Sequence, residues 1–334
     1  MEFSSFGKRY TRRTGARELM DDLGDAMARD TPVMMLGGGN PAHIPAVLDL
    51  LAARLRAVAE SPRELRRMLA DYASPAGEVR FRTALADLLR REYGWPLGPE
   101  HVALTGGSQS AFFLLFNLLG GDFDDGSRRR ILLPLTPEYV GYSDLGLQDE
   151  LFVARRPAIE HLEERQFKYH VDFSGLNPGS NIGAICVSRP SNPTGNVLTE
   201  AEVMRLASLA KDAEGPLSLD TAYGLPFPQI VFTDAKPYWD DNVILCMSLS
   251  KLGLPAVRTG IVVARPEIID ALTGLNAVLS LAVSSVGAVL VRDLIESGDI
   301  IGLSRDVIQP FYARRAQQTL GWLREALDLS LIHI

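Results

Sequence analysis

The chain has 334 residues, a formal net charge of −7, and apolar and charged fractions of 46% and 22%. This length suits one large domain with a smaller one, and this balance of residues excludes intrinsic disorder as the main state. The net negative charge argues against a general binder of nucleic acid or of anionic membranes. The basic run at 128–130 follows an acidic turn at 122–125, so we interpret it as a solvated loop.

The cysteines, the histidines and the longest uncharged segment predict no disulfide, metal site or membrane span. Cys186 and Cys246 each lie inside an apolar run, so we expect two buried structural thiols in a reducing cytoplasm. The five histidines lack a paired ligand spacing, and no metal site is predicted. The segment 271–291 is uncharged but contains threonine, asparagine and serine, which favours a buried or interface helix over a membrane span.

The apolar pattern predicts an α/β fold. An amphipathic helix is expected at about 16–28, and Thr199 with Glu202 forms a capping box that opens another helix. A long charged helix is expected at about 303–327, with a bend at Pro310. Strands that are apolar throughout and alternate with helices predict a mostly parallel sheet covered by helices on both faces. The predicted strands are 102–104, 131–133, 151–153, 182–187, 217–219, 243–247 and 260–264, and the remaining helices are 108–119 and about 200–212.

Polar residues gather just past the ends of these strands, which is where open α/β sheets bind their ligands. The segment 105–110 is a glycine turn before an apolar helix, and a helix N-terminus favours an anion such as phosphate. Taken alone, this segment also fits a plain strand-to-helix turn. Asn192 lies between prolines in a rigid loop, where it either donates to a ligand or simply forms a turn. Asp220 ends an apolar strand, where it either caps a turn or pairs with a cation.

The last cluster surrounds a lysine. Lys251 follows the apolar strand 243–247, and burial there would lower the pKa of its amine, which suits a nucleophile. Ser248 and Arg258 add a hydroxyl and a guanidinium, both suited to phosphate. A lysine at a strand edge, paired with an acidic side chain, is the alternative.

The order of these clusters resembles one family. Asn192 precedes Asp220 by 28 residues, and Asp220 precedes Lys251 by 31. This pattern resembles the pyridoxal-phosphate enzymes of the aspartate-aminotransferase fold, fold type I. Five strings are similar to those of the valine–pyruvate aminotransferases within that superfamily, and the likeness runs from Phe3 to Leu331. The strings lie at 37–45, 106–113, 137–142, 166–173 and 245–255.

The resemblance implies a transaminase that moves an amino group between valine or 2-oxoisovalerate and alanine or pyruvate. Lys251 would hold pyridoxal 5'-phosphate as a Schiff base and then act as general acid and base. Asp220 would pair with the pyridine nitrogen and make the ring an electron sink. Tyr223 and Asn192 would hydrogen-bond the ring oxygen, and Tyr139 would stack on the ring.

The resemblance also implies a phosphate site, a substrate site and a homodimer. Tyr72 matches a tyrosine that reaches the phosphate of the neighbouring subunit, so the sites would lie at a subunit interface. Gly38 and Gly39 would lie near the substrate side chain with Asn40, and Asn192 would help to bind the substrate. The phosphate would contact Gly107, Ser108, Gln109, Ser248 and Arg258.

By the same resemblance, residues 1–45 form an N-terminal arm and the start of a small domain. Residues 46–300 form the large cofactor-binding domain, and 301–334 begin an incomplete small domain. The arginine that binds the substrate carboxylate in this family is expected beyond residue 334, because Arg314, Arg315 and Arg324 lie in the long helix.

Two alternatives remain open. One is another activity on the same scaffold, such as a C–S lyase or a decarboxylase. The other is a non-catalytic regulator that binds the same cofactor, although the residues ahead of the sheet are too few and too weakly basic for a DNA-binding domain.

Overall fold

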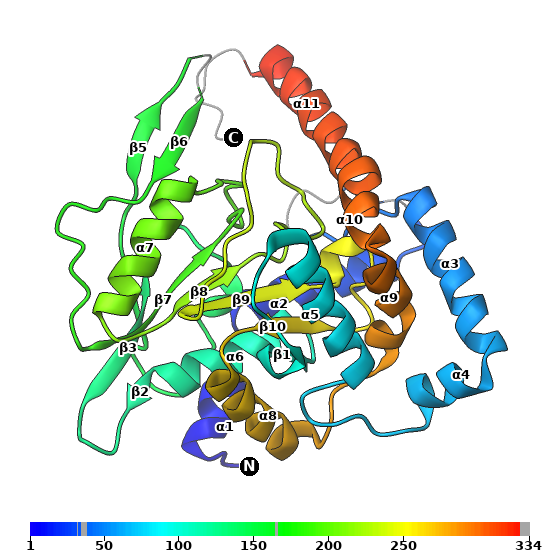
Figure 1. Ribbon diagram of the computed structural model, residues 1–334. Helices are drawn as coiled ribbons and strands as arrows, with labels where there is room; N and C mark the ends of the chain where they lie inside the picture. The colour runs from blue at the N-terminus through cyan, green and yellow to red at the C-terminus, as the bar shows by residue number, and fades with distance from the viewer. Residues whose placement is uncertain (32, 35–38, 164–165, 328–334) are drawn as a thin grey trace.

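The computed structural model describes residues 1–31, 33–34, 39–163 and 166–327. Its centre is a twisted sheet with helices on both sides, shown in Figure 1. The described residues form eight strands in this sheet, in the order β1-β10-β9-β8-β7-β3-β2, with β4 paired to β3. The strands are β1 Val102–Thr105, β2 Gly121–Asp122, β3 Arg128–Leu133, β4 Phe152–Ala154, β7 Ile182–Ser188, β8 Leu217–Asp220, β9 Val243–Ser248 and β10 Gly260–Val263.

The sheet is mostly parallel, as predicted. Strands β4, β3, β7, β8 and β9 pair in parallel, whereas β10 runs antiparallel to both of its neighbours, and β2 runs antiparallel to β3. Successive side chains of β7 enter opposite cores: Ile185 and Val187 pack in one cluster, Ala184 and Cys186 in the other. This alternation explains why the strand is apolar at every position. Both cysteines are free and buried, as predicted.

Helices α5, α7 and α9 pack on one face of the sheet, and α6 and α8 pack on the other. Helix α6 has the predicted bounds, and α7 begins after Thr199 with the predicted capping box. The helices are α1 Ser5–Tyr10, α2 Gly15–Met27, α3 Pro45–Glu60, α4 Pro62–Leu69, α5 Val79–Tyr93, α6 Ser108–Leu119, α7 Glu200–Asp212, α8 Pro266–Ser280, α9 Val286–Ser297, α10 Asp299–Leu303 and α11 Gln309–Ala326. Within the described residues, no helix is both long and apolar enough to cross a membrane.

Two predictions about local structure need correction, and one hairpin was not predicted. The uncharged segment 271–291 is two helices, because Leu281 takes a left-handed φ of 61° and ends α8. The basic run 128–130 begins strand β3 and is not a loop; Arg129 stacks on the Phe123 ring, 4.4 Å from its centroid. A hairpin of β5 Ala158–His161 and β6 Phe167–His170 was not predicted.

The long C-terminal helix is irregular just before Pro310, where the bend was predicted. A π-helical turn, Ser304–Ile308, separates α10 from α11, and Pro310 follows in the first turn of α11. Proline has no N–H to donate, so regular helical bonding cannot continue through it. Figure 1 shows α11 running away from the sheet.

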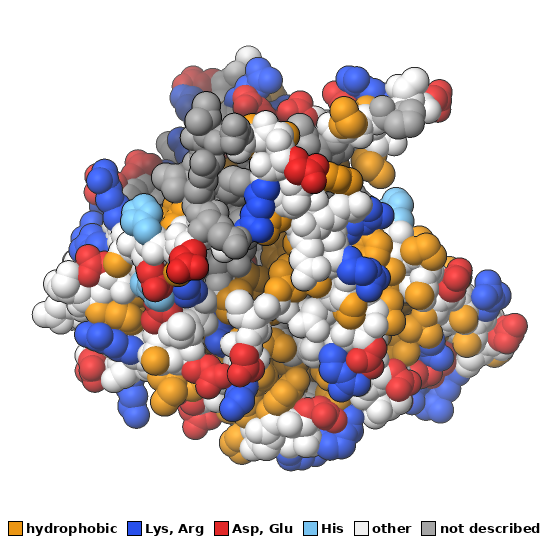
Figure 2. Space-filling view, turned by 90° about the horizontal axis from the view of Figure 1, so that it is seen from above, with side chains coloured by type: hydrophobic (Ala, Val, Ile, Leu, Met, Phe, Trp, Pro, Cys, Tyr) orange, Lys and Arg blue, Asp and Glu red, His pale blue; other side chains and the backbone are white. Residues whose placement is uncertain are grey.

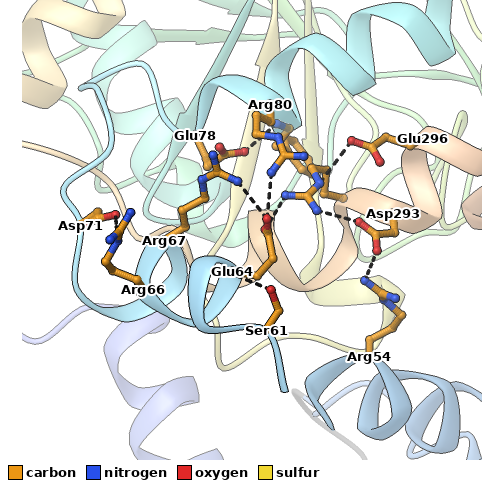
Figure 3. Close-up of polar contacts among 12 residues, drawn as sticks. Arg54, Ser61, Glu64, Arg66, Arg67, Asp71, Glu78, Arg80, Asp293 and Glu296 are labelled. Atoms are coloured by element: carbon orange, nitrogen blue, oxygen red, sulfur yellow. Dashed lines mark hydrogen bonds and ion pairs between the residues drawn. The ribbon is translucent and has the colours of Figure 1, made fainter. Parts of the chain in front are cut away.

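Hydrogen bonds between charged side chains connect helices α4, α5 and α9, as Figure 3 shows. Glu64 of α4 accepts hydrogen bonds from Arg67 and Arg80 at 2.9 Å and from Arg292 of α9 at 2.7 Å. Burial opposes ionisation of Glu64, but the hydrogen bonds and charges of Arg292 and Arg80 win and lower its pKa to about 2. On the face in Figure 2, acidic and basic side chains are interspersed.

Candidate active site

The registers of the central strands bring the predicted polar clusters to one edge of the sheet. Ser188 at the end of β7 lies opposite Asp220 at the end of β8. Thr105 of β1 lies opposite Gly260 of β10, which lies opposite Ser248 of β9. Segments that are far apart in the sequence therefore meet at this edge, as expected for a ligand site in an α/β fold.

Asp220 is a buried carboxyl, only 8% exposed. Its Oδ2 accepts a 2.6 Å hydrogen bond from the Tyr142 hydroxyl, and its Oδ1 accepts one of 2.9 Å from the N–H of Ala222. Burial raises the pKa of Asp220. A buried carboxylate is stable only when it is paired, so this position suits a cationic ligand atom.

Lys251 lies in the short 3-10 turn η3, Ser250–Leu252, directly after β9. Its Nζ is 5.0 Å from the centroid of the Tyr223 ring. Burial lowers the pKa of Lys251; the nearby Arg258 reinforces this, and Tyr312 and Asp220 oppose it. Burial and the charge of Asp220 raise the pKa of Tyr223. The site therefore holds an amine that loses its proton more readily than usual, close to the Tyr223 hydroxyl, which keeps its proton.

A glycine turn and an arginine form a cradle at the start of α6. Gly107 has a left-handed φ of 96°, and a Cβ there would lie 2.2 Å from Arg258 Nη2. Arg258 Nη1 donates to Ser250 Oγ at 3.3 Å, and Ser248 Oγ lies 3.0 Å from Ser250 Oγ. The N-terminus of α6, which begins at Ser108, faces this guanidinium. Free N–H groups, hydroxyls and a guanidinium are a donor set suited to phosphate.

The side chain of Gln109 contacts a neighbouring loop. Its side-chain Nε2 donates to the carbonyl of Gly141 at 2.9 Å, so the side chain holds the loop that carries Tyr139. Its Oε1 is buried and has no hydrogen-bond partner among the described residues. The pKa of Tyr139 is raised by burial and by the charges of Tyr223 and Asp220, and lowered by Arg258. Tyr139 therefore lies among the groups of the site.

Apart from Tyr223, the other predicted residues lie at the margin of the site or outside it. Asn192 and Tyr223 line a cavity of 610 Å³ beside the β5–β6 hairpin. Tyr72 is 88% exposed, in the loop after α4. A Cβ at Gly39 would meet no atom within 4 Å, and Gly38 lies outside the described residues. Asn40 Nδ2 contacts His43 Nε2 at 3.2 Å.

Several residues that the fold brings to the site were not predicted from the sequence as site residues. Glu138, Tyr142 and Ser188 form a polar chain behind Asp220. Ser250 Oγ accepts a hydrogen bond from Arg258. The Tyr312 hydroxyl, on α11, accepts a 3.0 Å hydrogen bond from the N–H of Ala42 and acts on the pKa of Lys251. Ser188 follows a predicted strand, and Glu138, Tyr142 and Ser250 lie within the strings at 137–142 and 245–255, but no site role was predicted for them.

The fold and this constellation define a class of enzyme, and comparisons with known proteins agree. The family model of the class I and II aminotransferases matches residues 31–332. The chain belongs to this family, whose members transfer amino groups with pyridoxal 5'-phosphate. Aspartate aminotransferase of Thermus thermophilus, only 20% identical, shares the fold with a TM-score of 0.75, covering 97% of this chain and 81% of that one.

Three of the compared proteins are more similar to this chain in sequence than that enzyme is. The valine–pyruvate aminotransferase of Escherichia coli K12 is 48% identical over an alignment of 335 positions, which covers 100% of this chain and 80% of that protein. The solved valine–pyruvate aminotransferase of Salmonella typhimurium LT2 is 48% identical with a TM-score of 0.84, covering 94% of this chain and 76% of that one. A solved protein of Psychrobacter arcticum 273-4 is 46% identical with a TM-score of 0.94, covering 98% and 79%.

The residues present fit the family's cofactor. The cradle at Gly107, which a Cβ would fill, offers donors to a phosphate. The buried Asp220 would stay ionised beside a protonated ring nitrogen, since an adjacent cation lowers the pKa of a carboxyl. The Lys251 amine lies over Tyr223 within the same site.

Proposed function

We propose that this chain is a valine–pyruvate aminotransferase. The observation that carries the proposal is the meeting of Lys251, Asp220 and Tyr223 at one sheet edge, in a chain 48% identical over its whole length to an enzyme of that name. The amino acids and 2-oxo acids of the reaction are small molecules, which suits a site of side chains at the end of a sheet.

The proposed roles follow from the geometry. Bound pyridoxal phosphate supplies an electron sink that stabilises negative charge on the substrate α-carbon. Asp220 would hold a proton on the ring nitrogen by its charge, and Tyr139 would cover one ring face. Tyr223 and Asn192 would donate to the ring oxygen. The phosphate would be bound by Ser248, Arg258 and the start of α6 at Gly107, Ser108 and Gln109.

Lys251 would be the group that moves protons. Because burial lowers the pKa of its amine, a larger fraction of Lys251 is neutral than for an exposed lysine. A neutral Nζ can take a proton from the substrate α-carbon and later return it, which is general acid–base catalysis. Burial keeps the Tyr223 hydroxyl protonated, so it can donate to a ligand oxygen during this transfer.

The substrates provide the test of this function. The loaded protein should consume valine only when pyruvate is present and form alanine in equal amount, without releasing ammonia or CO2. These products are measured by amino-acid analysis and by coupled assays. Ammonia release would instead indicate a lyase, CO2 release a decarboxylase, and no turnover with any amino acid a cofactor-binding regulator.

We extend the proposal to a homodimer. Tyr72, Val278 and Leu281 are 88%, 85% and 70% exposed. Asn276 Nδ2 donates to the carbonyl of Pro75 at 2.9 Å, which joins α8 to the loop of Tyr72, so these exposed side chains belong to neighbouring segments. A second copy of the chain would cover them and place Tyr72 at its partner's phosphate. Sedimentation equilibrium should give twice the mass of one chain, and a single-chain mass at micromolar concentration contradicts the dimer.

Two further parts of the proposal concern organisation and compartment. None of the described side chains of α11 is buried, which supports a small domain beginning near residue 301, after a large domain at 46–300 and an arm at 1–45. Two free, buried thiols are typical of proteins in a reducing compartment, and we place the enzyme in the cytoplasm.

A further inference from the structure

We propose that Glu138 is a positioning residue for Asp220, acting through the hydroxyls of Ser188 and Tyr142, and that one proton in this chain sets how strongly Tyr142 donates. The chain of contacts is continuous. Ser188 Oγ lies 2.6 Å from Glu138 Oε2, the two hydroxyls lie 3.3 Å apart, and Tyr142 lies 2.6 Å from Asp220 Oδ2. Tyr142 is 1% exposed and Ser188 is 4% exposed, so water has little access to the contacts from Ser188 through Tyr142 to Asp220.

Counting protons shows that the ionised form of Glu138 breaks this chain. Each hydroxyl carries one proton. With both carboxyls ionised, Ser188 donates its proton to Glu138 and Tyr142 donates its proton to Asp220. No proton is then left for the 3.3 Å contact between the two hydroxyl oxygens. Glu138 and Asp220 also repel each other as like charges.

One proton added to Glu138 aligns the chain. Protonated Oε2 donates to Ser188 Oγ, and the Ser188 hydroxyl turns to donate to Tyr142, which still donates to Asp220. The N–H of Ser188 donates to Glu138 Oε1 at 2.9 Å in both forms. No other proton changes its oxygen. Hydrogen bonds in an aligned chain polarise one another, so the bond to Asp220 is strengthened.

The surroundings of Glu138 favour this protonation at neutral pH. Burial is the largest effect and Asp220 adds to it. The two hydrogen bonds from Ser188 and one from the backbone of Tyr139 oppose them, and the pKa of Glu138 rises to about 7. The other titratable groups that act across this space are Tyr142 of the turn Val140–Tyr142 and Cys186 of β7. Neither is a cation, so neither favours ionised Glu138.

The expected effect is a change in reaction rate near neutral pH, and this part rests on the proposed role of Asp220. When Glu138 loses its proton, the bond from Tyr142 to Asp220 weakens. We expect the rate to fall about fivefold, which is the usual effect of losing one hydrogen bond between uncharged groups, here the bond from Ser188 to Tyr142.

Glu138→Gln keeps the packing of the side chain at position 138 but removes the carboxyl proton that titrates. Its Oε1 can accept from the Ser188 N–H, and its Nε2 always donates to Ser188 Oγ, so the chain stays aligned at every pH. The matched control is Glu202→Gln. Glu202 likewise accepts a backbone N–H and a hydroxyl, both from Thr199 at 2.8 Å, but at the start of α7.

Two measurements on the full chain test the proposal. Carbon-13 NMR of glutamate labelled at Cδ, with and without cofactor, should show one carboxyl titrating between about pH 6 and pH 8 that is missing in Glu138→Gln. The ratio of wild-type kcat to that of Glu138→Gln should fall about fivefold over the same range. The ratio of wild type to Glu202→Gln should stay constant.

The outcomes decide the proposal even if valine is not the substrate, because the NMR titration needs none and any accepted amino donor serves for kcat. A Glu138 signal that stays at its ionised position throughout overturns it. A pH-independent loss in Glu138→Gln, with the wild-type profile retained, shows a merely structural role and also overturns it. If Glu138→Gln does not fold, Tyr142→Phe must remove the same pH component, since it cuts the chain at Asp220.

Discussion

Replacing Lys251 with alanine is expected to slow amino transfer by about ten-thousandfold, the upper range for loss of a positioned acid–base group. Lys251 is the amine that the sheet edge holds beside Tyr223, with a pKa lowered by burial. Among the described residues, Lys251 is the one lysine whose charge acts on the pKa of Asp220. Rates are measured with valine and pyruvate. The visible absorbance of the cofactor-loaded protein is recorded as well, and the part that would depend on a covalent bond between the cofactor and Lys251 should be lost in the variant.

Lys251→Arg is the informative companion variant. Arginine keeps the positive charge and much of the length but does not lose its proton near neutral pH. It should therefore be about as inactive as alanine, although its charge is retained. Lys211→Ala, at the exposed end of α7, is the control and should keep the wild-type rate. An unchanged absorbance in Lys251→Ala, or a turnover near that of the wild type, contradicts the assignment.

Asp220→Asn is expected to slow the reaction by about a thousandfold, which corresponds to the cost of breaking a buried ion pair. Asparagine has nearly the same shape. Its carbonyl oxygen can accept from the N–H of Ala222 while its Nδ2 donates to the Tyr142 hydroxyl, so the change removes mainly the charge. Without that charge, the ring nitrogen has no anion to keep it protonated, and the electron sink is weaker. Single-turnover rates with valine measure this effect.

The chain offers a closely matched control for this variant. Asp240 accepts a hydrogen bond from the Tyr238 hydroxyl at 2.7 Å and one from the N–H of Asn242 at 2.8 Å. Asp220 has the same two partners in kind, a tyrosine and the N–H two residues on, but lies at the opposite end of the strands. Asp240→Asn should therefore keep the wild-type rate. A similar loss in both variants would point to a folding defect and would contradict a charge-specific role for Asp220.

Much of the fold was predictable because it depends on local patterns. Apolar runs that feed two cores specify strands such as β7, and Thr199 with Glu202 specifies the start of α7. The direction of β10 was not predictable, since an apolar run has the same pattern in either direction. The break at Leu281 was missed because apolar periodicity continues across it.

The sequence by itself determined most strands of the central sheet, the order of the polar clusters and the side chains suited to a phosphate, a ring nitrogen and an amine. These features are local, because each depends on a strand end and the few residues after it. Only the tertiary structure decided that Tyr142 donates to Asp220 across 78 residues and that Tyr312 meets Ala42 across 270. Such contacts depend on strand register and helix packing, which bring together residues far apart in the sequence and are not encoded in any local pattern.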